Sequence, residues 1–588
     1  MDEQPKSIWK KSWKGRSAFL IWLVFFVITF LVMAIIGLVT NAPKHPPYPL
    51  AISILGAVVA SVVLGVWLLI RWLCCRRNFK RFLFGVACFA TLIALFYAEE
   101  DWRGKHDWEK FKREWEAKGE HFDFASVVPP PVPDDQNFAM APVVASCYAA
   151  RLGKNGNRLK SYNSNVVNRL DFDLGDLDLF TNGIGNWAKG TTSNLKIYQA
   201  QYRELAAKTN LFVVPPTPQS PAADVLLALG KYDSTVEELR QASQLPQCRF
   251  PLNYDTECPA NILLPQLAAL KSSSQLLKLR ALAELQDGQS DKALADVKLS
   301  LRLADSIHTE PFIISHLVRI AMSQITLQPM YEGLAEHRWS DAQLIALDAE
   351  LAKLDFLADS KVSMRGEMGL QSGIIDYLRK NPDQIPNLLE MFGGQTDPQN
   401  FHPPVSFKIF FHLIPSGWFD QNRLRLARIS VEFYLTMADE VQRTASPDSV
   451  RRADAAFEQE IFHKNPYNIL ARVLSVSPGA VTKKFAYGQA SMGLARTAIA
   501  LERHRLAHGE FPESLDVLAP QFIAKVPHDV IGGGPLKYRR TRDGQFVLYS
   551  VGWNEKDDGG VVVYKKVTST DVDRDQGDWV WRYPAKVD

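Results

Sequence analysis

The chain has 588 residues, which is too long for one ordinary domain, and its net charge is only +3. Residues 1–98 contain 11 Lys and Arg against 2 Asp and Glu; subtracted from the totals of 67 and 64, this leaves residues 99–588 with 56 basic and 62 acidic residues. No basic run occurs in this mildly acidic part, so the composition argues against a protein that binds nucleic acid.

Three apolar segments at the N-terminus, 18–39, 50–70 and 82–98, predict transmembrane helices. A helix needs roughly 20 apolar residues to cross the hydrocarbon core of a bilayer. Lys and Arg are concentrated before the first segment and between the second and third, and such residues mark the cytoplasmic side. We therefore expect three spans in residues 1–98, a cytoplasmic N-terminus, and everything after about residue 99 outside the cytoplasm. The first segment is too long for a signal peptide and lacks a small-residue cleavage site, so we expect it to remain as an anchor.

Residues 99–140 predict a charged amphipathic helix that continues from the third span, followed by a proline-rich linker. Residues 141–485 predict an α-helical domain. Within it, residues 226–246 and 279–305 each place a glycine between two helical stretches, which resembles a tetratricopeptide hairpin. A true repeat array and a generic helical domain both remain open.

Two cysteines in the exported part stand close together in "CRFPLNYDTEC", at Cys248 and Cys258. An oxidising compartment would favour a disulfide between them. The alternative is two separate buried thiols, because spacing in the sequence does not determine geometry.

Residues 486–588 predict a small α+β domain, in which a helix ending at Gly509 precedes an antiparallel sheet. Asp543–Gly544 joins two strand-like runs and predicts a hairpin, and residues 561–566 and 578–583 could add strands. The predicted fold class is therefore a membrane-anchored, mainly α protein with a large helical domain and a small C-terminal α+β domain.

Three short motifs in this C-terminal part carry a family resemblance. Their residues are Gly509, Phe511 and Pro512, then Gly534, Pro535 and Tyr538, then Ser550, Gly552, Gly559 and Gly560. Over about 90 residues the pattern resembles the globular domain of the major pseudopilin of type II secretion systems. The chain as a whole resembles long, uncharacterised bacterial envelope proteins with multi-pass anchors.

The pseudopilin resemblance implies that the acidic loop "GWNEKDDGG" binds calcium. The ligands that it implies are Asn554, Asp557 and Asp558, with Asp573 and its acidic neighbours as additions. Calcium takes six to eight oxygen ligands, and a flexible acidic loop can supply them. The alternative is a solvated acidic turn without a cation.

No nucleophile motif, phosphate-binding loop or zinc pattern stands in a suitable setting. His504 and His508 lie four apart on a predicted helix, but Arg505 stands where a zinc protease needs glutamate. We therefore expect a non-catalytic protein of the bacterial inner membrane with its large domain in the periplasm. The three spans would contact the lipid bilayer, and the exported part would serve as a scaffold for an unknown envelope partner. The alternatives are an exported hydrolase with its site in the helical domain, and an accessory component of a type II secretion or pilus-like system.

Overall fold

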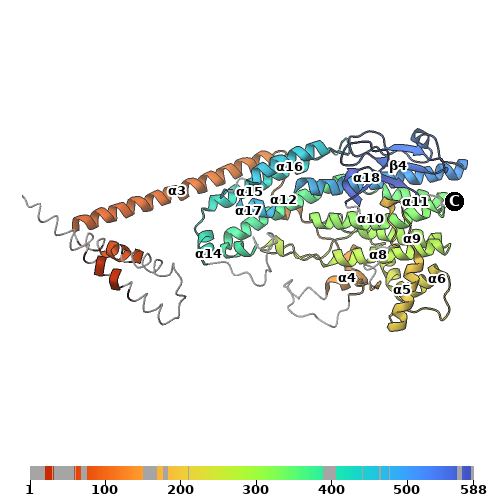
Figure 1. Ribbon diagram of the computed structural model, residues 1–588, viewed down its shortest axis with the longest axis horizontal. Helices are drawn as coiled ribbons and strands as arrows, with labels where there is room; N and C mark the ends of the chain where they lie inside the picture. The colour runs from red at the N-terminus through yellow and green to blue at the C-terminus, as the bar shows by residue number, and fades with distance from the viewer. Residues whose placement is uncertain are drawn as a thin grey trace, which may run out of the picture. The chain divides into compact units, whose positions relative to one another are not determined.

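The computed structural model (Figure 1) describes most of the chain after residue 75 and scattered residues before it. The described residues are 20, 22–24, 26–28, 31, 58–59, 61–67, 70, 74, 76–149, 168–175, 183–209, 211–388, 405–439, 441–462, 465–475, 477–565 and 572–584. The chain divides into two compact units, Met1–Glu100 and Asp101–Asp588, and each is described by itself.

Helices dominate the described residues. Their bounds are α3 (Arg76–Glu116), α4 (Pro142–Ala149), α5 (Leu195–Lys208), α6 (Pro221–Leu229), α7 (Asp233–Ala242), α8 (Pro265–Gln286), α9 (Ser290–Asp305), α10 (Ile313–Ala335), α11 (Asp341–Leu351), α12 (Phe356–Lys380), α14 (Val405–His412), α15 (Ser416–Glu432), α16 (Pro447–Phe462), α17 (Ile469–Leu474) and α18 (Pro478–His508).

The prediction of three N-terminal transmembrane helices is wrong for this structure. Among the described residues, one helix, α3, is long and apolar enough to cross a membrane. The segments 18–39 and 50–70 lie for the most part outside the described residues. Hydropathy measures apolar length alone and does not by itself establish a continuous helix.

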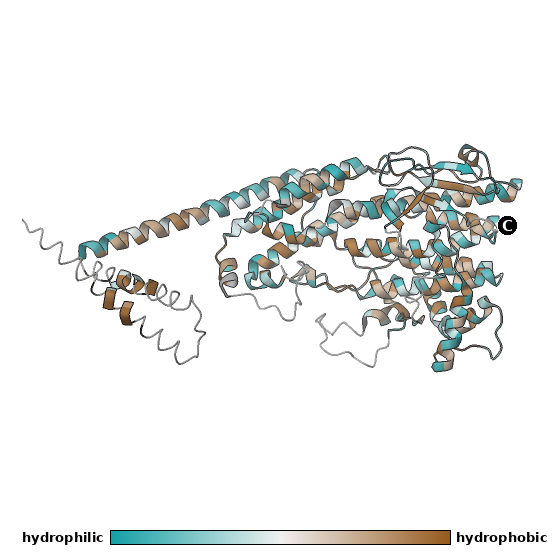
Figure 2. Cartoon of the chain, viewed as in Figure 1, coloured by the Kyte–Doolittle hydropathy of each residue, from teal (hydrophilic) through white to brown (hydrophobic). Residues whose placement is uncertain are grey.

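The third predicted segment, 82–98, lies inside α3, which runs on without a break for 41 residues, or roughly 60 Å. Figure 2 shows α3 apolar over its first half beyond a polar beginning, and increasingly polar toward its end. This confirms that the charged helix predicted after residue 99 continues from the apolar segment, because no proline interrupts the sequence.

The helices α4 to α9 enclose one hydrophobic core, in which Phe138, Tyr202 and Phe250 are each at most 1% exposed. The predicted hairpin at 279–305 is confirmed, since α8 and α9 pack together across Gly288, whose φ of 78° suits glycine. A lone helical pair of this kind does not by itself make a repeat array.

A second core joins α10, α11, α12 and α18 to the C-terminal strands (Figure 1). Tyr331, Phe485 and Trp581 are fully buried there. Helix α11 begins with a capping box, in which Ser340 accepts a hydrogen bond from the backbone of Gln343 and the Gln343 side chain accepts one from the backbone of Ser340.

The C-terminal strands form two small antiparallel sheets. Their bounds are β3 (Lys537–Arg540), β4 (Phe546–Ser550), β5 (Val562–Tyr564), β6 (Val572–Gly577) and β7 (Trp579–Arg582). The first sheet has the order β3-β4-β7, and the second pairs β5 with β6. The hairpin predicted at Asp543–Gly544 is confirmed, and β4, at the centre of its sheet, is buried at every residue.

Two features of this region differ from the expectations from the sequence: the domain boundary and one strand. The boundary predicted at residue 485 lies inside α18, and α18 shares its core with α10. Strand β6, with the sequence "VDRDQG", was not expected as a strand, because its residues have low strand propensity. Pairing with β5 outweighs that local preference.

Candidate functional site

The acidic loop that follows β4 is held by hydrogen bonds within the protein. Asp557 accepts hydrogen bonds from the hydroxyl of Tyr549 at 2.9 Å and the backbone N–H of Gly559 at 3.1 Å, and pairs with Lys537 at 3.3 Å. These partners, led by Tyr549, lower the pKa of Asp557. The loop therefore has a defined carboxylate at its tip.

Two buried carboxylates fix the base of this loop. Asp578 is 1% exposed and accepts from the backbone N–H groups of Gly560 at 2.6 Å, Val561 at 3.2 Å and Asp558 at 3.3 Å. Asp529 accepts from Ser550 Oγ at 2.7 Å and from the backbone of the following residue at 2.9 Å. Burial raises the pKa of both carboxyls.

The residues predicted to bind calcium are partly brought together. Asn554 donates to Asp558 at 2.8 Å, and both lie in the same loop as Asp557. Asp573 lies on β6, where it accepts from the backbone N–H of Asp575 at 2.9 Å. No group of three or more His, Cys, Asp and Glu that could hold a metal occurs among the described residues, so calcium binding stays a prediction.

Cys248 and Cys258 are both free cysteines in this structure, and the disulfide between them stays a prediction. Cys248 packs beside the core of α4–α9, where burial raises the pKa of its thiol to about 12. Cys258 directly precedes a short 3₁₀ turn and is 3% exposed. The short spacing in the sequence limits the loop length but does not direct the two side chains toward one another.

The histidines also have structural surroundings. His504 and His508 stack on each other with ring centroids 4.2 Å apart, and the Nδ1 atom of each lies 3.0–3.1 Å from a backbone carbonyl oxygen. His316 is fully buried, and burial lowers its pKa to about 3. These three histidines are used in packing.

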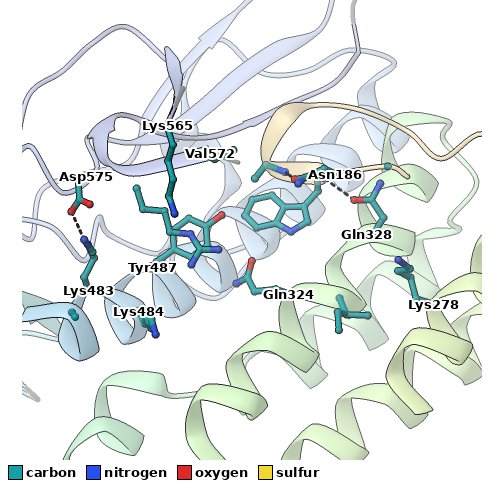
Figure 3. A pocket seen from close by; sticks show the side chains of 16 residues that line it. Asn186, Lys278, Gln324, Gln328, Lys483, Lys484, Tyr487, Lys565, Val572 and Asp575 are labelled. Carbon is teal, nitrogen blue, oxygen red and sulfur yellow. Dashed lines mark hydrogen bonds and ion pairs between the residues drawn. The ribbon is translucent and has the colours of Figure 1, made fainter. Parts of the chain in front are cut away.

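The structure also contains a cavity of about 610 Å³ that the sequence did not indicate (Figure 3). Its walls come from α8, α10, α18, β6 and the 3₁₀ turn η5 (Trp187–Lys189). The lining residues are Gly185, Asn186, Trp187, Ala188, Lys278, Gln324, Ile325, Gln328, Ala480, Lys483, Lys484, Tyr487, Lys565, Val572, Arg574 and Asp575.

The cavity is strongly basic. Among the described residues that line it, five side chains are cationic and one, Asp575, is a carboxylate, which forms an ion pair with Lys483. Burial lowers the pKa of Lys278, and the nearby Glu332 opposes that shift. The guanidinium carbon of Arg574 lies 4.1 Å from the centre of the Tyr487 ring.

Helix α10 fixes the loop that forms one wall. The side chain of Gln328 accepts from the backbone N–H of Trp187 at 2.6 Å and donates to the carbonyl of Thr191 at 3.1 Å. A side chain at Gly185 would not fit, because its Cβ would lie 2.6 Å from the backbone nitrogen of Ser193. The wall is therefore rigidly placed against the helix.

No protein-family model, no curated protein and no solved structure matches this chain.

Proposed function

We propose that this chain is a non-catalytic protein of the bacterial envelope, anchored in the inner membrane by α3. In this proposal Asp101–Asp588 is a scaffold domain in the periplasm, with a second envelope protein as its partner.

The observation that carries the proposal is the exposure of the apolar part of α3. None of the side chains in its most apolar stretch of 18 residues is buried. Phe84, Phe89 and Leu92 are 71%, 66% and 64% exposed. Leaving such a side chain in water costs roughly 1.5–3 kcal/mol relative to burial, which supports a bilayer as the environment of these side chains.

The flanking charges support the orientation. Arg76, Arg77, Lys80 and Arg81 precede the apolar stretch, and Glu99, Glu100 and Asp101 follow it. Basic residues next to a span favour the cytoplasmic side. The chain before α3 is then cytoplasmic, and the chain after it lies across the membrane.

Reporter fusions test this orientation. A reporter that is active only in the periplasm should be inactive when fused after residue 75 and active when fused after residue 300. A reporter active only in the cytoplasm should give the opposite pattern. Cytoplasmic activity at residue 300 would contradict the proposal, as would recovery of the full chain in the soluble fraction.

The cavity weighs against the hydrolase alternative. A hydrolase would be supported by carboxylates or histidines that converge in a cavity. The cavity described above instead combines five cationic side chains with one carboxylate. We therefore keep the scaffold as the proposed function and treat the cavity as a place for binding.

As a second candidate, we propose that the C-terminal part is a pseudopilin-like module stabilised by calcium. Helix α18 ends at Gly509 in the left-handed conformation, and a small antiparallel sheet follows, in the order that the resemblance implies. Asn554, Asp557 and Asp558 lie within one loop whose base is fixed by Asp578. A cation there would offset the repulsion between neighbouring carboxylates.

Thermal unfolding with calcium or a chelator tests this second candidate. Binding to the folded state alone stabilises it by about 2.7 kcal/mol at a calcium concentration 100 times the Kd. The full chain in detergent should therefore melt at a higher temperature with calcium. In the double variant Asp557→Ala, Asp558→Ala both melting temperatures should fall, because Asp557 loses its contact with Tyr549, and the difference between them should vanish. If the wild type melted at the same temperature with and without millimolar calcium, the loop would be a solvated acidic turn that binds no cation.

A further inference from the structure

We propose that the basic cavity between α8, α10, α18 and β6 is a binding site for a small, multivalent anion that carries phosphate or carboxylate groups. This inference is independent of the membrane anchor, because every residue that lines the cavity belongs to Asp101–Asp588.

The charge of the cavity contrasts with that of the surrounding chain. Residues 99–588 carry more acidic than basic side chains, whereas the cavity has five cations and one anion. Cations gathered from several elements repel one another, which lowers the stability of the empty site. An anion bound among them would turn this repulsion into attraction.

Several of these cations have no partner among the described residues. Lys278, Lys484 and Lys565 make no hydrogen bond or ion pair with any described residue, whereas Lys483 is paired with Asp575. Oε1 of the nearby Glu332 accepts from Gln328 at 2.7 Å and from the backbone of Ser193 at 2.9 Å, and the charge of Glu332 acts on Lys278 without an ion pair. Lys484 and Lys565 therefore supply charge here without an ion-pair partner among the described residues.

Neutral donors point into the same space. Within the described part of the chain, Gln324 Nε2 is buried without a hydrogen-bond acceptor, and Figure 3 places the side chain of Gln324 between Tyr487 and Lys278. An amide N–H together with lysine ammonium groups is a donor set that suits phosphate or carboxylate oxygens. The buried donor is satisfied when such an oxygen occupies the cavity.

The size and walls of the cavity favour a small molecule. Its volume of about 610 Å³ lies within the usual range of roughly 300–1,000 Å³ for small-molecule sites. Trp187 and Tyr487 are both at most 5% exposed and form a firm wall, with ring centroids 6.3 Å apart. The cations come from separate elements, with Lys278 on α8 and Lys484 on α18, which favours a ligand that carries more than one anionic group.

A variant of Asp575 can distinguish a change in anion binding from a folding defect. Among the described residues that line the cavity, Asp575 is the one carboxylate, and it forms an ion pair with the ammonium group of Lys483. Replacing it with asparagine removes one repulsive charge and releases one cation. The variant Asp575→Asn should therefore bind the anion more tightly than the wild type, a gain that a folding defect would not produce.

The test is calorimetric titration of the full chain in detergent with sodium pyrophosphate and, separately, with citrate, at constant ionic strength. We expect saturable binding with one site per chain. Lys278→Met and the double variant Lys484→Gln, Lys565→Gln should each weaken binding roughly tenfold or more, because each removes charged hydrogen-bond donors. The double variant changes two exposed side chains, so it keeps the test valid if Lys278→Met fails to fold.

Lys271→Met is the matched control, because Lys271 lies on the same helix as Lys278, is exposed and does not line the cavity. Binding of pyrophosphate alone assigns the site to phosphate groups, binding of citrate alone assigns it to carboxylates, and binding of both supports a site selected by charge. Absence of saturable binding by either anion overturns the proposal. An equal loss of affinity in Lys271→Met and Lys278→Met also overturns it.

Discussion

The buried carboxyl group of Glu310 gives a clear prediction of how stability depends on pH. It is 3% exposed, and its carboxylate accepts from Gln266 Nε2 at 2.8 Å and from the hydroxyl of Ser315. Burial raises its pKa to about 7, against an ordinary value of 4.5, and these two hydrogen bonds oppose the shift.

Because the pKa of Glu310 is higher in the folded state, the neutral carboxyl stabilises the fold at low pH. This contribution is complete below pH 4.5 and is lost as the pH rises through about 7. The difference corresponds to about 3 kcal/mol in the free energy of unfolding. Glu310→Gln stays neutral and keeps an amide for the same partners, so its stability relative to wild type should increase from pH 5 to pH 8.

Denaturant unfolding of both proteins across this pH range checks the prediction. The exposed Glu513→Gln is the control, because its side chain is 83% exposed, and its profile should follow that of the wild type. A constant difference between wild type and Glu310→Gln at all pH values would mean that Glu310 is already ionised in the fold at pH 5.

At the scale of elements, the contact between α3 and α15 depends on two glycines. A Cβ on Gly104 would lie 2.2 Å from the carbonyl oxygen of Gly417. The same stretch of α3 supplies Asp101, which accepts from the backbone N–H of Gly417 at 2.7 Å, and Arg103, which donates to Tyr467 at 2.9 Å. Close backbone approach therefore brings these polar contacts within reach.

Gly104→Ala should destabilise the protein by roughly 1–3 kcal/mol, because backbone atoms on α15 must shift to admit the methyl group. Gly85→Ala, in the same helix, is the control. Nothing lies within 4 Å of a Cβ at Gly85, so that change should be neutral or slightly stabilising through helix propensity. Thermal unfolding of the two variants in detergent compares them. A similar melting temperature for both would show that α15 yields easily at Gly417.

Local signals in the sequence were sufficient for some elements. The Ser340 and Gln343 pair predicts the start of α11, and Gly509 predicts the end of α18, because each acts on backbone groups within a few residues. Strand β6 could not be predicted in this way, since it forms by pairing with β5. Apolar length likewise led to three predicted spans where one described helix qualifies.

At the scale of the whole molecule, the candidate sites differ in how far the sequence reveals them. The acidic loop is contiguous, so its carboxylates are visible as a cluster, although the anchoring role of Asp529 is not. The basic cavity collects Lys278 and Arg574, which are about 300 residues apart. Each of these is an unremarkable charged residue in its own segment, and only the packing of α8, α18 and β6 places them around one space.

The same long-range packing sets an order of events during synthesis. Trp187 stacks near Trp581 with ring centroids 5.5 Å apart, and the Tyr331 hydroxyl donates to the carbonyl of Arg582 at 2.9 Å. At roughly 5–20 residues per second, a ribosome needs some 20–80 s to proceed from the first tryptophan to the second. Once α10 is complete at Ala335, roughly 12–50 s of this interval remain, during which Tyr331 lacks the strand that covers it. The nascent chain therefore exposes apolar surface for some seconds to tens of seconds, and we expect a chaperone to protect it during synthesis.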